Sequence, residues 1–258
     1  MVQAFKHHWT GIEQVATTLF RGKFLFYFIP GLIVGLIYLY FQFQARQALA
    51  LVHAGDDIPV IGGAISWLAD GAFSIFDLIT SEFYKFVVLV VLSPVNCILS
   101  EKFDSYLTGR EFKFDLIRLI NDFLRMILIV ISALFLEYVF LAIWWVFSWV
   151  LPDFIGESIF FLIASFFVGF SFYDYSMERH GLNFFKSWGL GFSRMSYMLI
   201  TGAMFTLMIK IPVVGIIVAP VLTSMISTAV YILLTNNGSK PNPVPAIKSN
   251  DQTDQLDT

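Results

Sequence analysis

The stretch MILIVISALFLEYVFLAIWWVFSWVL, residues 126–151, decides the fold of this chain. It runs for 26 residues, and Glu137 is the one charged side chain in it. About 20 apolar residues in a helix cross the roughly 30 Å hydrocarbon core of a bilayer, at about 1.5 Å per residue. Residues 126–151 are therefore predicted to form a membrane-spanning helix.

Further apolar runs lie on both sides of that stretch. The whole chain is 57% hydrophobic and only 14% charged, whereas soluble domains carry about 25% charged residues. The sequence therefore predicts an all-α integral membrane protein, with about 4–6 transmembrane or partly penetrating helices in a single membrane domain, residues 24–234. The additional candidate spans are Phe24–Phe43, Ser158–Phe172, Ser196–Ile209 and Val213–Leu234, with Phe83–Leu99 weaker because Pro94 and neighbouring polar residues interrupt it.

Basic residues are distributed unevenly between the loops. All but three of the 16 Lys and Arg residues precede the first span, lie between the second and third, or follow the fourth or the last span. The exceptions are Arg46, Lys85 and Lys210. Because cytoplasmic loops carry the excess of Lys and Arg, both termini are predicted to be cytoplasmic, in a multi-pass protein of the cell (inner) membrane.

Two segments outside the membrane domain are predicted from their polarity. In residues 1–23, apolar side chains recur at helical spacing, which indicates an amphipathic helix lying in the cytoplasmic interface, with His7 and His8 solvated. Residues 235–258 are polar and contain no aromatic residue, so they are predicted to be a disordered cytoplasmic tail. The apolar positions of the first segment are Phe5, Trp9, Ile12, Val15, Ala16, Leu19 and Phe20.

Two polar strings interrupt the apolar pattern: SPVNCILSEKFDSYLTG, residues 93–109, and FYDYSMERHGLNFFKSWGLGF, residues 172–192. In order and spacing they resemble the signature regions of the CysZ-type sulfate permeases and the related etoposide-induced membrane proteins. The closing helix, with Pro212, Gly215 and Pro220, fits the same resemblance. The matching positions in the strings are Ser93, Pro94, Asn96, Glu101, Lys102 and Gly109, then Asp174, Tyr175, Arg179, Gly181 and Ser187.

The resemblance implies a helical permease that admits sulfate or a related small oxyanion. A non-transporting membrane scaffold or membrane-organising protein of the same fold is the alternative. Bacterial members of the family carry a Gly followed by paired arginines before the first span, whereas here FRGKF, residues 20–24, places Arg21 and Lys23 on either side of Gly22.

Two readings of this FRGKF turn stay open. A Gly with exposed amides between two cations is suited to a dianion. Equally, Arg21 and Lys23 would anchor the first span at anionic lipid headgroups.

A second candidate site heads the long helix. Asp115, Arg118, Asp122 and Arg125 are spaced by three and four residues, so opposite charges share one helical surface. They form either an interfacial ion-pair ladder or an anion relay in which Asp122 balances Arg118 and Arg125. Glu101 and Lys102 are expected nearby, which completes the predicted substrate-binding set with Arg21, Gly22 and Lys23.

Glu137 is the most isolated charge in the chain. At bilayer depth an ionisable group must face other helices or water. Either Glu137 is a proton-coupling acid, or the helix breaks near it and brings it close to a surface.

The remaining motifs indicate no enzyme, cofactor, metal site or nucleic-acid partner. The single Cys97 is expected to pack as a small apolar residue, and GLGF around Gly189 and Gly191 is expected to serve close helix packing. Gly31 and Gly35 form a small-xxx-small pair that is suited to helix contact and a homo-oligomer. The expected partners are thus sulfate or a similar oxyanion, membrane lipids and a second copy.

Overall fold

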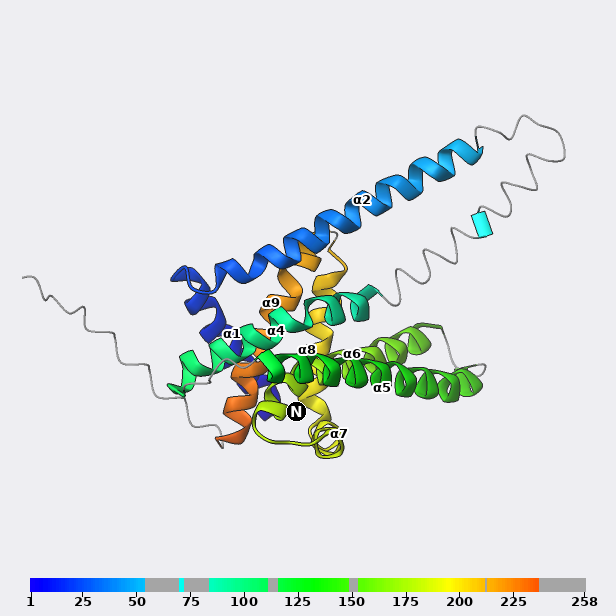
Figure 1. The fold of residues 1–258 in the computed structure, drawn as a ribbon. Helices are drawn as coiled ribbons and strands as arrows, with labels where there is room; N and C mark the ends of the chain where they lie inside the picture. Colours follow the sequence, from blue (N-terminus) through cyan, green and yellow to red (C-terminus); the bar gives the residue numbers. More distant parts are fainter. Residues whose placement is uncertain (54–69, 72–83, 111–115, 149–152, 212, 237–258) are drawn as a thin grey trace, which may run out of the picture.

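The computed structural model describes residues 1–53, 70–71, 84–110, 116–148, 153–211 and 213–236. The tail predicted to be disordered lies outside this part from residue 237 onward. Helices form nearly all of what is described, which confirms the all-α prediction (Figure 1). They are α1 (Val2–Phe20), η1 (Leu25–Tyr27), α2 (Phe28–His53), α4 (Tyr84–Thr108), α5 (Leu116–Ser148), α6 (Asp153–Arg179), α7 (Phe184–Ser193), α8 (Met195–Ile209) and α9 (Val214–Thr235).

Several of these helices are long and apolar enough to cross a bilayer, so the chain is a multi-pass membrane protein. Within the described residues, α8 departs from the predicted spans because it has only 15 residues, or about 22 Å at 1.5 Å per residue. It meets α7 at a bend of 90°, and the two helices count as a span only when joined. The four full-length candidates are Leu25–Gln47, Ile120–Phe147, Ile155–Arg179 and Val214–Thr235.

The last helix, α9, is the centre of the fold. It packs against α1, α2, α4, α6 and α8, and 83% of its apolar window is buried. By contrast, only 11% of the window in α2 is buried, and α2 projects away from the other helices (Figure 1). An apolar helix with so little protein around it is stable where lipid surrounds it.

Glycines set the closest helix crossings. A Cβ atom added to Gly202 of α8 would overlap the carbonyl oxygen of Ser165 in α6, and one added to Gly169 of α6 would overlap that of Met198 in α8. The backbones of α6 and α8 are therefore in direct contact. The packing role predicted for GLGF is confirmed at Gly191, where a Cβ would lie 2.7 Å from the ring of Phe170. It is wrong at Gly189, where a Cβ would meet nothing within 4 Å.

The small-residue pair of the first span packs inside the chain. A Cβ on Gly31 would lie 3.0 Å from the Cα of Ile217 in α9, whereas one on Gly35 would make only ordinary contacts. Gly31 therefore serves the α2–α9 contact, and homo-oligomerisation stays a prediction.

The amphipathic helix α1 packs its histidines against the protein. His7 and His8 are buried, with exposed fractions of 8% and 2%, so the prediction of solvated histidines is wrong. The physical reason is that the small Ala4 and Gly11 let α1 approach α9 closely: a Cβ on Gly11 would lie 3.1 Å from a methyl group of Val230. The large Phe5 and Trp9 point outward, where a membrane protein has lipid.

Replacing Gly202 tests the α6–α8 crossing. We expect Gly202→Ala to lower the free energy of unfolding by about 1–3 kcal/mol, because the added methyl group forces two backbones apart. Gly189→Ala is the matched control, since a Cβ there meets nothing within 4 Å. Thermal unfolding in detergent measures both variants, and an equal melting temperature for the two would contradict the crossing.

Candidate functional site

The turn between α1 and the first span has its amides already occupied. The N–H groups of Arg21, Gly22 and Lys23 donate to the carbonyl oxygens of Thr17, Leu19 and Thr18 at 3.3, 2.9 and 3.3 Å. The prediction of exposed amides is therefore wrong: they cap the C-terminus of α1, and Gly22 supplies the positive φ of 73° that this cap needs. A helix C-terminus carries partial negative charge, so any anion here must be held by the side chains.

The cationic side chains of this turn lie at the protein surface. Arg21 and Lys23 are both exposed, and the Lys23 ammonium lies 4.4 Å from the ring centroid of Tyr106 in α4. This contact brings the turn to the helix that also carries Glu101, which is half-buried, and Lys102, which is exposed. The structure thus places the Arg21–Lys23 turn and the α4 segment of the predicted substrate-binding set side by side.

The guanidinium of Arg125 joins three elements. It holds both carboxylate oxygens of Asp174 in α6, with Nε 3.0 Å from Oδ2 and Nη2 2.8 Å from Oδ1. It also donates to the carbonyl oxygen of Leu182 at 2.9 Å and to the hydroxyl of Ser187 in α7 at 2.9 Å. This ion pair joins α6 to α5.

A second arginine makes the equivalent connection between α6, α4 and α9. Nε of Arg179 lies 3.3 Å from Oδ2 of Asp104, and both side chains are almost wholly buried, with exposed fractions of 2% and 0%. Nη2 of Arg179 donates to the hydroxyl of Ser100 at 2.7 Å, and that hydroxyl lies 2.7 Å from the hydroxyl of Thr228 in α9. A single buried network therefore joins three helices.

Carboxyl groups lie next to both arginines. The Cys97 thiol donates to Oδ2 of Asp122 at 3.5 Å. The carboxyl group of Glu178 lies beside that of Asp122. Within the described residues, Asp122 and Arg125 thus contact side chains of other helices. Asp115 and the side chain of Arg118 lie outside the described part of the chain, so the ladder along α5 stays a prediction.

The charge balance of this inner cluster is acidic. Asp104, Asp122, Asp174 and Glu178 contribute four carboxyl groups, against the two guanidinium groups of Arg125 and Arg179. An oxyanion could reach either arginine only by displacing a carboxylate. The cluster is consequently better suited to holding protons than to holding a dianion.

Glu137 lies apart from the inner cluster. Helix α5 continues without a break through this position, and Glu137 is buried, with an exposed fraction of 5%. The reading in which the helix breaks near it is therefore wrong. Fifteen residues separate it from Asp122, or about 22 Å along the helix.

A separate buried network fixes α1 to the membrane domain. Nδ1 of His8 lies 2.7 Å from the carbonyl oxygen of Ala4, so Nδ1 carries a proton and donates it. Nε2 lies 2.7 Å from the hydroxyl of Thr201 in α8, which lies 3.1 Å from the phenol of Tyr173 in α6. Burial lowers the pKa of His8 to about 4, so the ring is neutral at pH 7.

No protein-family model matches the chain, and no curated protein does. The two strings that carry the resemblance nevertheless meet in the structure: Asp104 from residues 93–109 pairs with Arg179 from residues 172–192. The residues that sequence reasoning missed are Asp104, Ser100 and Thr228. Polar side chains in otherwise apolar helices were the available signal for them.

Breaking the Arg125–Asp174 pair tests its role. We expect Arg125→Ala to cost about 3–5 kcal/mol of stability, because Asp174 is left buried without its partner. The double variant Arg125→Met/Asp174→Leu should recover most of that loss, and Lys186→Ala on exposed α7 is the control. Chemical unfolding in detergent measures all three, and a single variant as stable as the control would refute the role.

Low pH is expected to weaken the attachment of α1 to the membrane domain. The pKa of His8 is lower in the folded protein, about 4, than its usual 6.5, so the unfolded chain binds a proton first. Stability is therefore complete above about pH 6.5 and declines between pH 6.5 and about 4, by at most about 3 kcal/mol. Hydrogen exchange of α1 amides across this range measures the loss; His8→Gln should flatten the profile, and an unchanged slope would contradict the assignment.

Proposed function

We propose that the chain is a membrane permease for sulfate or a related small oxyanion, with both termini in the cytoplasm. The observation that carries the proposal is the buried ionisable network of α4, α5 and α6. Ionisable groups inside a membrane bundle are costly and by default mark pathways for ions or protons.

In this proposal the anion is first attracted by the surface cations. Arg21 and Lys23 on the turn and Lys102 on α4 are all exposed, so their charges raise the local anion concentration. Gly22 contributes through the shape of the turn, and its amide takes no part. Arg118 at the start of α5 belongs to the same predicted set.

The carboxyl-rich interior supplies proton coupling. Moving one elementary charge through a 100 mV membrane potential costs about 2.3 kcal/mol, so a dianion entering a negative interior needs compensating protons. The Asp122–Glu178 pair is the described group that we assign to carry one, because its two carboxyl groups lie beside each other in the inner cluster, next to Arg125. Glu137, farther along α5, is the second candidate on the proton path.

The scaffold alternative is favoured by one specific observation. The guanidinium of Arg125 donates to Asp174, Leu182 and Ser187, so it holds helices together without any anion. A scaffold predicts that substitutions in the inner cluster change only stability.

Sulfate uptake into proteoliposomes distinguishes the two functions. We expect saturable uptake of labelled sulfate that falls at least about tenfold in Arg21→Ala/Lys23→Ala, since each cation near a surface is worth about 1 kcal/mol. Glu178→Gln should remove the response to an imposed proton gradient, and Lys186→Ala should leave uptake unchanged. Uptake no higher than in empty vesicles, from correctly folded protein, would favour the scaffold.

A further inference from the structure

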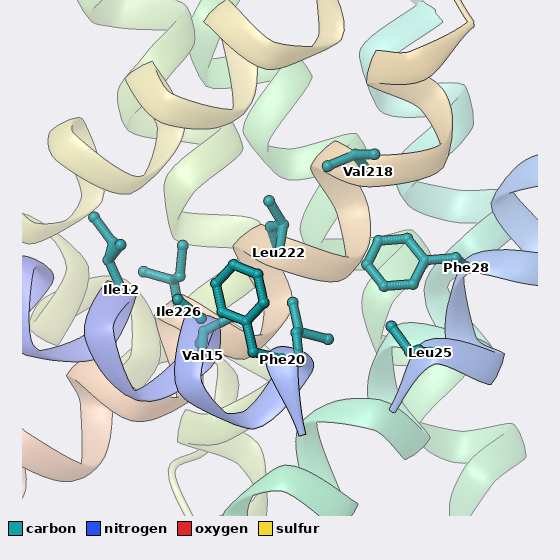
Figure 2. Close-up of a pocket in the computed structure, with 10 residues that line it drawn as sticks. Ile12, Val15, Phe20, Leu25, Phe28, Val218, Leu222 and Ile226 are labelled. Atoms are coloured by element: carbon teal, nitrogen blue, oxygen red, sulfur yellow. The ribbon is translucent and has the colours of Figure 1, made fainter. Parts of the chain in front are cut away.

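An apolar cavity of about 500 Å³ lies where α1, the start of the first span and α9 meet. Side chains from these three segments converge on it, with the rings of Phe20 and Phe28 on either side of α9 residues Val218 and Leu222 (Figure 2). Its volume lies within the range of roughly 300–1,000 Å³ found for ligand sites. The lining residues are Ile12, Val15, Ala16, Leu19, Phe20, Leu25, Phe28, Val218, Leu222 and Ile226, all of them apolar.

The lining determines what can occupy this cavity. A buried water molecule needs about two to four polar partners, which these side chains do not offer. The outer face of α1 is also apolar, with Trp9 66% exposed, so the cavity belongs to a surface that lipid covers. Its occupant must therefore present a hydrocarbon chain.

The turn that carries Arg21 and Lys23 adjoins the cavity. Phe20 and Leu25, which are 92% and 52% exposed, are lining residues that flank the turn carrying Arg21 and Lys23. The amides of that turn are used to cap α1, so the turn offers positive side chains only. A groove that ends at two exposed cations matches a molecule with a hydrocarbon chain joined to an anionic head.

We infer that this groove is a binding site for an anionic phospholipid, with an acyl chain along α1 and α9 and the phosphate at Arg21 and Lys23. The phosphate ester shares its chemistry with a free oxyanion, but the apolar groove beside the cations favours the lipid. The inference goes beyond the proposed transport function and does not depend on it. A lipid held here ties α1 to the first span.

Native mass spectrometry of the full, delipidated chain tests the site with phosphatidylglycerol and phosphatidylcholine of equal chain length. We expect one phosphatidylglycerol to be retained in preference, with about fivefold tighter binding for each cation at the site. Arg21→Ala/Lys23→Ala should remove the preference for phosphatidylglycerol and keep the weaker phosphatidylcholine binding. Lys186→Ala, which removes an exposed cation elsewhere, should change nothing.

Substitutions that fill the groove with a larger side chain test whether the acyl chain binds there. Ala16→Phe or Val218→Phe should abolish retention of both lipids, whereas Thr17→Trp, on the exposed side of α1, should not. Two filling positions on different helices keep the test valid if one variant misfolds. Equal binding of the two lipids, or retention unaffected by either filling variant, would overturn the site.

Competition with sulfate distinguishes the two anions that Arg21 and Lys23 could bind, the phosphate of a lipid and a free oxyanion. Sulfate should displace phosphatidylglycerol no more than chloride of the same ionic strength does; complete displacement by sulfate alone would assign the cations to a free oxyanion and overturn the lipid site. Sulfate uptake in Ala16→Phe distinguishes this inference from transport. Uptake that persists when lipid retention is lost would leave the proposed permease intact, and lipid retention without uptake would leave only the lipid site.

Discussion

The salt bridge between Arg179 and Asp104 meets the constraint on which the interior depends: a charge that is buried away from water is costly unless it is paired within the protein. Each charge there must find its partner on another helix, and the partner must be held in place by further contacts. Ser100 and Thr228 do this for Arg179, and they bring α4 and α9 into register with α6. The Arg125–Asp174 pair repeats the arrangement between α5 and α6. The positions of these helices therefore follow from the pairing of a few charges.

The surrounding lipid explains the composition of the helix faces. In α1, small residues and histidines face the protein, while Phe5 and Trp9 face outward. Large apolar side chains can face lipid at no cost. The close contacts inside the protein are therefore made by small residues, which allow two helix backbones to approach each other. This is why the apolar stripe of residues 1–23 predicted an amphipathic helix but not the burial of His7 and His8.

The number and approximate position of the spans could be predicted because a long apolar run indicates directly that lipid surrounds that segment. The shortness of α8 was visible in the run 196–209, but its 90° bend against α7 was not. The partners of charged residues could not be predicted: a spacing of three and four pointed Arg125 to its own helix, whereas its partner Asp174 lies 49 residues away. Similarly, Gly22 was correctly singled out, but local sequence could not show that the amides beside it cap α1.

The contact between Gly169 and Gly202 has a mechanical consequence. Where two backbones touch, no layer of side chains remains that could deform or slide between them. Helices α6 and α8 must then move as one rigid unit. Helix α7 moves with them, because Arg125 of α5 donates to Ser187 in α7 and to the carbonyl oxygen of Leu182 just before it. Helix α2 lies outside this rigid unit, because only 11% of its apolar window is buried and its close contact through Gly31 is with α9.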